Sequence, residues 1–332
     1  MLKLKYLFEN FELAKKCLEL YEYDMDSMDN MFRYFRISSN AIYPFRLKAD
    51  TDRICFLRLS PIEEKELSDV ETEVCLIEWL IERGFPVMRP VQMKDGKLFG
   101  QVSTEWGTYN VSCFEKVPGK SLEDIEGTLQ IVKGYGETLG KLHALMKEYP
   151  YSEKRRNHKM LLDEIEERMQ EYGASEIVSK EFFSVCKELE KLSISNSDYG
   201  VIHYDFEPDN VFYDEKDDTF SVIDFDDAIC CWYALDVVRA LDALDEVVGA
   251  SDIEEATISF LEGYRVATAF TEEQMHSMPI MRRVVRLQEY ATLLYVMSET
   301  VEDMPDWMNE LVEKLKWKLR WLEEAMDKGM SD

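Results

Sequence analysis

The sequence predicts an α+β protein with a small β-rich part at its N-terminus and a large, mainly helical part at its C-terminus. Apolar and polar residues alternate over residues 32–60 and 88–117, which is the period of half-buried strands. Beyond residue 117, apart from short hairpin-like segments, apolar residues recur at the spacing of helices. We therefore expect an N-terminal lobe over residues 1–117 and a C-terminal lobe over residues 118–332.

The N-terminal lobe is predicted to combine helices with strands. Residues 9–24 and 24–33 are rich in Leu, Met and acidic side chains and are expected to form short helices. A polar turn at residues 50–52 separates two strands, and residues 94–97 have the composition of a hairpin turn. Apolar side chains at helical spacing predict a further helix over residues 66–83, which the following glycine would end.

The segment that is most informative about chemistry runs from His203 to Asn210 and is followed fourteen residues later by Asp224. Asp205 and Asn210 lie five residues apart on a predicted loop, and Asp224 ends a β-like run over residues 220–223. Phosphoryl transfer requires a carboxylate that orients the attacking hydroxyl and oxygen ligands that hold Mg²⁺ against the phosphates. Asp205 suits the first task, and Asn210 and Asp224 suit the second. The order H-x-D-x-x-x-x-N followed by D-F-x is typical of kinase-like catalytic cores.

Further segments with distinctive residues lie on both sides of this loop. Residues 200–214 read GVIHYDFEPDNVFYD, and residues 221–228 read SVIDFDDA. The other segments are, in chain order, residues 38–43, 55–59, Glu73 with 79–80 and 84–87, 114–122, 139–145 and 235–236. Together they resemble the aminoglycoside phosphotransferase and choline kinase-like family, which also includes homoserine, methylthioribose and fructosamine kinases. The resemblance covers residues 30–245 and implies a protein-kinase-like, two-lobed fold with phosphotransferase activity.

The resemblance also implies a nucleotide site in the N-terminal lobe. Arg58 stands where most kinases have the lysine that contacts the nucleotide phosphates, and Glu73 would pair with it. The loop over the phosphates contains no glycine, so a plain β-turn suits these residues equally well. Phe114 would lie behind the adenine, with hinge residues contacting it through backbone groups. The implied nucleotide-binding residues are Ser38, Ser39, Asn40, Arg58, Glu73, Phe114, Glu115 and Val117.

We expect the charged residues of the catalytic segment to have different roles. Asp205 is the catalytic residue that accepts or orients the proton of the acceptor hydroxyl, and His203 is a structural brace. Glu207 stands where protein kinases have a lysine, which leaves Mg²⁺ and Arg58 to stabilise the transferring charge. Asp226 would contact a second metal, face the substrate or cap a turn. Asp236 resembles the family's aspartate that caps a helix and braces the catalytic loop.

The C-terminal helices contain two features with alternative interpretations. Arg282, Arg283 and Arg286 lie on one helical face, where pairing with neighbouring acidic helices is favoured over a clamp for an anionic substrate. Three tryptophans belong to an amphipathic ending, and we expect them to pack in the core rather than form a stacking wall for a substrate. They are Trp307, Trp317 and Trp321.

Composition limits the possible partners. The 332 residues have a formal net charge of −28, and the part beyond residue 100 accounts for −25 of it. Because nucleic acids and anionic membranes require a basic face, neither is expected as a partner. The acidic surface either keeps the protein soluble or attracts a cationic substrate. No apolar run approaches the roughly 18 residues of a membrane span, and scattered cysteines without zinc-like spacing indicate free thiols in the cytoplasm.

These observations predict an ATP- or GTP-dependent, Mg²⁺-requiring phosphotransferase that phosphorylates a hydroxyl of a small molecule. An aminoglycoside, an amino alcohol or a similar cationic metabolite is the favoured acceptor. A protein Ser/Thr kinase is an alternative, which Glu207 and the missing activation segment disfavour. A catalytically impaired nucleotide-binding scaffold is the other, favoured only by the glycine-free loop and Arg58. The sequence predicts no oligomeric state.

Overall fold

The computed structural model describes residues 3–6, 10–33, 36–37, 40–150, 152–249, 252–299 and 304–329. They form two compact units. The sheet unit comprises Tyr6–Asp124 and Asp209–Asp226, and the helical unit comprises Lys3–Lys5, Ile125–Pro208 and Asp227–Asp332. The predicted α+β class is confirmed. The lobe boundary after residue 117 stays a prediction, and the hairpin that precedes Asp224 belongs to the sheet unit.

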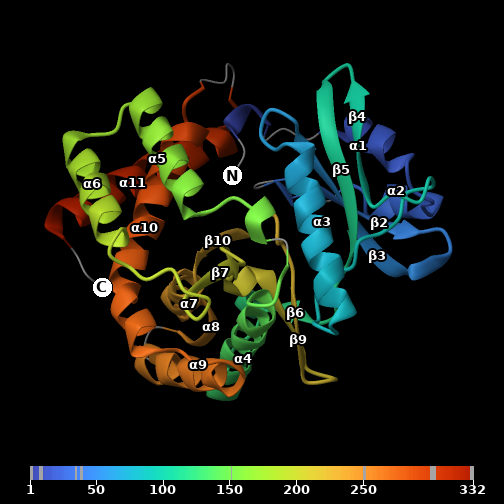
Figure 1. Cartoon of the computed structure of the whole chain (residues 1–332). Helices are drawn as coiled ribbons and strands as arrows, with labels where there is room; N and C mark the ends of the chain where they lie inside the picture. Colours follow the sequence, from blue (N-terminus) through green and yellow to red (C-terminus); the bar gives the residue numbers. More distant parts are fainter. Residues whose placement is uncertain are drawn as a thin grey trace. The chain divides into compact units, whose positions relative to one another are not determined.

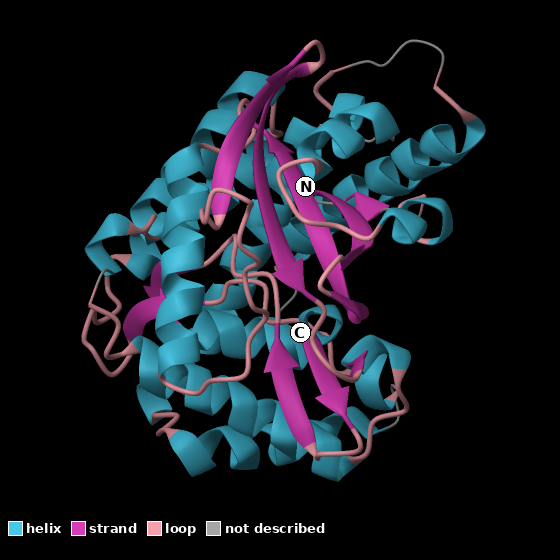
Figure 2. Cartoon of the chain, turned by 90° about the vertical axis from the view of Figure 1, so that its right-hand side faces the viewer, coloured by secondary structure: helices cyan, strands magenta, loops and turns pink. Residues whose placement is uncertain are grey.

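The sheet unit is built on a five-stranded antiparallel sheet, whose strands appear as magenta arrows in Figure 2. Alternate residues of its long central strand, among them Cys55 and Leu57, point into an apolar core that also contains Phe45 and Leu13. The opposite face of that strand is therefore left for polar side chains. In spatial order the strands are β1 (Arg36–Ile37), β2 (Ala41–Leu47), β3 (Asp50–Pro61), β5 (Gly107–Glu115) and β4 (Phe99–Thr104).

Helix α3 of the sheet unit (Leu67–Glu82) begins and ends within one residue of the helix predicted over residues 66–83. A capping box between Glu66 and Asp69 begins it, and its buried face includes the predicted apolar positions Val70 and Val74. Gly84, which follows the helix, has φ 72°, a left-handed conformation that glycine adopts without strain. The helices predicted at the N-terminus are present but shorter than expected. They are α1 (Phe11–Leu18) and α2 (Met25–Asn30), and Leu4–Tyr6 forms one 3₁₀ turn, η1.

Two strand boundaries were predicted wrongly. The turn between β2 and β3 lies at Lys48 and Ala49 rather than at residues 50–52, because Leu47 pairs with Asp50 and closes the turn immediately. Residues 88–98, which were predicted to be extended, do not form a strand of any sheet. The turn at residues 94–97 does form, with Met93 N donating to Lys97 O at 2.7 Å, but β4 and β5 are joined further along the chain.

A second, three-stranded sheet of the sheet unit ends at the motif residues. Val211 pairs with Val222, so the residues beyond this pair leave the same end of the hairpin. Ile223 N donates to Asn210 O at 3.0 Å, which continues the pairing by one step. The strands are β6 (Lys120–Ser121), β8 (Val211–Asp214) and β9 (Thr219–Val222), with short turns η2 (Leu122–Asp124) and η4 (Pro208–Asn210).

The helical unit consists of long helices around one small sheet of β7 (Tyr199–Ile202) and β10 (Ile229–Trp232). Its helices are α4 (Leu129–Met146), α5 (His158–Tyr172), α6 (Glu176–Leu189), α7 (Tyr233–Asp242), α8 (Asp245–Val248), α9 (Ile253–Ala267), α10 (Glu272–Val296) and α11 (Asp306–Lys328), and η3 (Ser152–Lys154) is a single turn. Helices α4 and α9 lie side by side (Figure 1). A Cβ at Gly136 or Gly140 would overlap backbone oxygens of α9, so glycine is required there.

The two features predicted for the C-terminal helices have different outcomes. Arg282 pairs with Asp242, and Arg283 pairs with Glu181 and Glu188, so these arginines make the predicted pairs with acidic helices. The expectation that the tryptophans pack in the core was wrong, because α11 buries another face, which includes Leu315 and Leu322. The exposed fractions of Trp307, Trp317 and Trp321 are 50%, 62% and 44%.

Among the residues that the structure describes, no helix combines the length and the apolar composition needed to cross a membrane.

Candidate active site

A buried cation of the sheet unit lies between two carboxylates. Because the alternate residues of β3 point into the core, Arg58 points to the other face, and it is only 6% exposed. Its guanidinium forms the predicted ion pair with Glu73 of α3, and its Nη1 lies 3.3 Å from Asp224 Oδ1. The guanidinium carbon is 4.8 Å from the centre of the Phe114 ring. The structure therefore brings together four of the residues that the sequence singled out.

Sequence analysis missed a second cation of this site. Lys65, in the loop between β3 and α3, places Nζ 2.6 Å from Asp226 Oδ2. Asn40 Nδ2 donates to the same oxygen at 2.8 Å. The buried Asn110 side chain donates to the Lys65 carbonyl oxygen at 2.7 Å and fixes the loop. Asp226 thus has two donors of its own. Lys65 is the one basic residue in an acidic stretch of sequence, which is a weak signal without the structure.

The charges of this cluster do not balance. Two cations, Arg58 and Lys65, face the three carboxylates Glu73, Asp224 and Asp226, which leaves one negative charge. Burial and the charge of Asp226 raise the pKa of Asp224 well above its usual range. Burial would also raise the pKa of Asp226, but Lys65 and Arg58 lower it below its usual range. The excess of negative charge in this cluster suits a divalent cation with oxygen ligands.

Buried oxygens in the same cluster that have no hydrogen-bond partner in the described part of the chain agree with this excess of negative charge. Glu73 Oε1 and Asn40 Oδ1 are buried and have no hydrogen-bond partner among the described residues. Asn210 is 5% exposed, and its backbone is tied to Ile223, the neighbour of Asp224. Carboxylate and amide oxygens are the ligand types that Mg²⁺ takes, so the residue types of this cluster fit the ion. Ser38 and Ser39, which were predicted to contact the phosphates, lie outside the described residues.

The predicted hinge borders a hollow of the sheet unit. Glu115 N donates to Arg89 O at 2.8 Å, and Lys116 N donates to Ile54 O at 2.9 Å. In the described part of the chain no hydrogen bond from the Val117 N–H is found, so this donor remains for a ligand. The hollow has a volume of about 360 Å³ and is lined by residues 52–54 and 115–119. It is large enough for a nucleotide base.

In the helical unit, the loop that contains Asp205 is held by a buried aspartate. Asp236 accepts hydrogen bonds from the backbone N–H groups of His203 at 2.8 Å and Tyr204 at 2.7 Å. Its Oδ2 also lies 3.0 Å from Nε2 of the buried His143. These contacts hold Tyr204 at φ 76°, a conformation that is strained for a bulky residue. His203 braces the loop as predicted, because its Nδ1 accepts from Asp205 N at 3.3 Å.

One expectation for Asp236 was wrong. The N-cap of α7 is Trp232, and Asp236 lies within the first turn of the helix, where its side chain accepts from the catalytic loop instead of the helix N-terminus. The bracing role is therefore present without the capping role.

Arg239, one turn after Asp236, was also missed by sequence analysis. Its Nη1 lies 2.8 Å from Glu207 Oε1 and 3.6 Å from Asp205 Oδ1. Burial opposes the charge of Arg239, but Tyr204 and these two carboxylates raise its pKa above its ordinary value. Glu207 is therefore half of an ion pair rather than an isolated negative charge.

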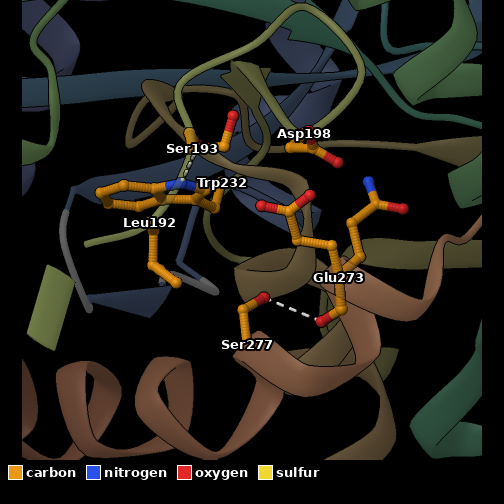
Figure 3. A pocket seen from close by; sticks show the side chains of 7 residues that line it. Leu192, Ser193, Asp198, Trp232, Glu273 and Ser277 are labelled. Carbon is orange, nitrogen blue, oxygen red and sulfur yellow. Dashed lines mark hydrogen bonds between the residues drawn. The ribbon is translucent and has the colours of Figure 1, made fainter. Parts of the chain in front are cut away.

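A small hollow elsewhere in the helical unit does not provide a ligand site (Figure 3). Its volume is about 10 Å³, at most that of one water molecule. Several of the polar groups around it are paired with each other, because Trp232 Nε1 donates to Ser193 O and the Ser277 hydroxyl donates to Gln274 O. Asp198 accepts from two serine hydroxyls. This hollow is therefore a small gap in the packing of the helical unit.

The fold and the order of the motif residues define a kinase-like phosphotransferase. The chain belongs to the phosphotransferase enzyme family, whose model matches residues 37–275. Homoserine kinase of Caulobacter vibrioides is 25% identical to it over 223 residues, which span 66% of this chain and 68% of that protein. The predicted family and the prediction of a small-molecule kinase are confirmed at this level.

Solved structures confirm the predicted fold. The amicoumacin kinase hAmiN, in complex with AMP-PNP, Ca²⁺ and Ami, superposes with a TM-score of 0.80 at 18% identity, covering 98% of this chain and 96% of that one. A microcompartment-associated aminopropanol kinase superposes with a TM-score of 0.69 at 20% identity, covering 97% of this chain and 99% of that one.

Proposed function

We propose that the protein transfers the γ-phosphoryl group of ATP to a hydroxyl of a small molecule that also has an amine. The observation that supports this most strongly is the contact of Arg58 with both Glu73 and Asp224. A buried cation held between a helix carboxylate and the motif aspartate is an arrangement that kinase-like enzymes use on nucleotide phosphates. The motif loop with Asp205 leads directly into Asn210 in the chain, so donor and acceptor groups come from one segment.

On the donor side, residues of the sheet unit have separate tasks. Arg58, held by Glu73, contacts the phosphates together with Asn40. The hinge offers the Val117 N–H to the base, with Glu115 beside it and Phe114 behind it. Asn210 and Asp224 would hold Mg²⁺. The metal, when bound, neutralises the phosphate oxygens. A neighbour crystallised with AMP-PNP supports ATP over GTP as the donor.

On the acceptor side, Asp205 takes the proton of the attacking hydroxyl. Its carboxylate is 38% exposed and so accessible to a ligand, while its backbone is held through His203. Asp205, Glu207 and Arg239 together have one net negative charge, which favours an ammonium over a carboxylate nearby. Homoserine and aminopropanol, the compounds named in two of the related kinases, both have a hydroxyl and an amine, and homoserine has a carboxylate as well. We therefore propose an amino alcohol or amino sugar as acceptor.

We also place this reaction in the cytoplasm. All seven cysteines are free thiols, and none forms a disulfide in the structure. Free thiols persist in a reducing compartment, where ATP is also plentiful.

Binding of the nucleotide is expected to depend on the metal. ATP with Mg²⁺ should raise the melting temperature, and ATP with EDTA should raise it much less, because Asp224 and Asn210 act on the phosphates through the cation. Ligand at about 100 times its Kd contributes roughly 2.7 kcal/mol, so a thermal-shift assay can measure the difference. Asp224→Asn should remove the Mg²⁺-dependent part, and the exposed Asp217→Asn should not. Equal shifts with and without Mg²⁺ would disprove the assignment of the two ligands.

The acceptor is expected to be cationic. Among hydroxyl compounds of similar size, those with an ammonium group should give the highest kcat/KM, and that value should fall as salt rises, because mobile ions screen the attraction of the acidic surface. Steady-state kinetics on a panel of amino alcohols, amino sugars and their carboxylate analogues at two ionic strengths checks this. A best substrate that is anionic, with activity lost in Arg286→Ala, would favour an anion clamp instead.

A further inference from the structure

Helix α7 contacts the catalytic loop at two points. Asp236 accepts hydrogen bonds from the backbone N–H groups of His203 and Tyr204. Arg239 reaches the two carboxylates of the same loop. Residues three apart in a helix lie on the same face, so one face of α7 holds both the backbone and the side chains of the loop.

The surroundings of Arg239 show how it is held. Its side chain is 8% exposed, and a buried charge of this kind requires partners. Besides the pair with Glu207, its Nη2 donates to Gln288 Oε1 at 3.2 Å, and its guanidinium carbon lies 4.9 Å from the centre of the Tyr204 ring. Gln288 is itself oriented by a hydrogen bond of 3.0 Å to Thr292. The Nε of Arg239 is buried and has no partner among the described residues.

The carboxylates that Arg239 contacts differ from it in exposure. The side chains of Asp205 and Glu207 are 38% and 36% exposed, so both retain surface for a ligand. Two carboxylates close together on one loop repel each other, so a cation that contacts both stabilises their arrangement. Protein kinases with the H-x-D motif have a lysine two residues after the catalytic aspartate, whereas this chain has Glu207 there. The loop therefore lacks a positive charge of its own.

We propose that Arg239 is a positioning residue that holds Asp205 and Glu207 together and supplies, from α7, the positive charge that the catalytic loop lacks. The proposal rests on the proposed function in one respect, the role of Asp205 toward the acceptor hydroxyl. It also revises the expectation that Mg²⁺ and Arg58 provide most of the electrostatic stabilisation, because Arg239 is a further cation and belongs to the acceptor side.

Substitution of Arg239 tests this proposal. Arg239→Met removes the charge and keeps most of the side-chain volume, and Arg282→Met is the matched control, because Arg282 pairs with Asp242 and touches neither carboxylate. We expect Arg239→Met to lower kcat about 10²-fold, as a displaced catalytic group does, with Mg·ATP affinity by thermal shift unchanged. Arg282→Met should keep the kcat of the wild type. A wild-type kcat in Arg239→Met would overturn the proposal.

A double variant separates positioning by charge from simple support of the fold. Adding Glu207→Gln to Arg239→Met removes the carboxylate that the lost guanidinium leaves uncompensated, so kcat should recover about tenfold relative to Arg239→Met. A residue that only supports the fold would show no recovery, and that result would contradict the proposal. If Arg239→Met does not fold, Arg239→Lys replaces it. The lysine variant should keep kcat within about tenfold of the wild type, since it retains the charge. A loss as large as that of Asp205→Asn would contradict the proposal.

Urea unfolding provides a readout that does not require an acceptor. The wild type, Arg239→Met, Glu207→Gln and the double variant form a cycle in which Arg239→Met should lower the midpoint less in the Glu207→Gln background than in the wild type. Equal lowering in both backgrounds would overturn the pairing. An inactive wild type with a non-additive cycle would instead contradict only the proposed function.

Discussion

Replacing Asp205 with asparagine is expected to lower kcat by about 10³-fold, within the range that a positioned general base contributes. Asparagine keeps the shape of the side chain but cannot accept the proton of the acceptor hydroxyl. The backbone of the loop is held through His203 and Asp236, so it should keep its conformation. Steady-state kinetics with the best amine acceptor measures the loss, and thermal shift with Mg·ATP should show nucleotide affinity within twofold of the wild type.

The contrast with Asp224 makes this prediction specific. Asp224 contacts Arg58 in the sheet unit, whereas Asp205 belongs to the helical unit and contacts Arg239. Asp224→Asn should therefore lose Mg²⁺-dependent nucleotide binding together with turnover. Asp217→Asn, in the exposed turn between β8 and β9, is the control that should behave as the wild type. If the Asp205 and Asp224 variants lost binding and turnover alike, the division of roles between the two aspartates would be wrong.

Replacing Asp236 with alanine is expected to cause the largest loss of stability among these variants. Asp236 is fully buried, and its two oxygens satisfy two backbone N–H groups and lie against His143. The substitution leaves those groups buried and unpaired, and removing one partner of such a network typically costs about 3–5 kcal/mol in the free energy of unfolding. Urea unfolding followed by circular dichroism measures the change.

A neighbouring aspartate serves as the control for Asp236. Asp242, near the end of the same helix, has a side chain that is 45% exposed and pairs with Arg282. Exposed pairs of this kind contribute about 0–1 kcal/mol, so Asp242→Ala should unfold close to the wild-type midpoint. A similar midpoint for Asp236→Ala would show that the loop holds its strained Tyr204 conformation without the helix.

Much of the fold and part of the site could be predicted because the signals were local. The apolar spacing of α3, its glycine stop and the order of Asp205, Asn210 and Asp224 all lie within short windows of sequence. The pairing of Arg58 with Glu73 came from family resemblance, which encodes a contact between residues fifteen positions apart. The assigned roles of these residues stay predictions until kinetics tests them.

Other features depend on contacts that no local pattern specifies. Lys65 meets Asp226 across 161 positions, and Arg239 meets Glu207 across 32. Neither has a distinctive sequence neighbourhood, so only the folded chain reveals it. The prediction for the α11 tryptophans was wrong for a related reason. Periodicity shows that a helix has an apolar stripe, but the buried face depends on which neighbour the helix packs against.

Those tryptophans decide how folding of this protein can be observed. Of the six tryptophans, Trp106 and the three on α11 are solvent-exposed, while Trp79 and Trp232 are buried. Intrinsic fluorescence of the native protein should therefore already emit mainly at the wavelengths of water-exposed indole, and unfolding should shift its spectrum only slightly. A fluorescence melt would underreport the transition, and quenching by added acrylamide would mostly sample α11. Replacing Trp106 and the three α11 tryptophans together with phenylalanine would remove this background and leave the two buried indoles as reporters, one in each unit.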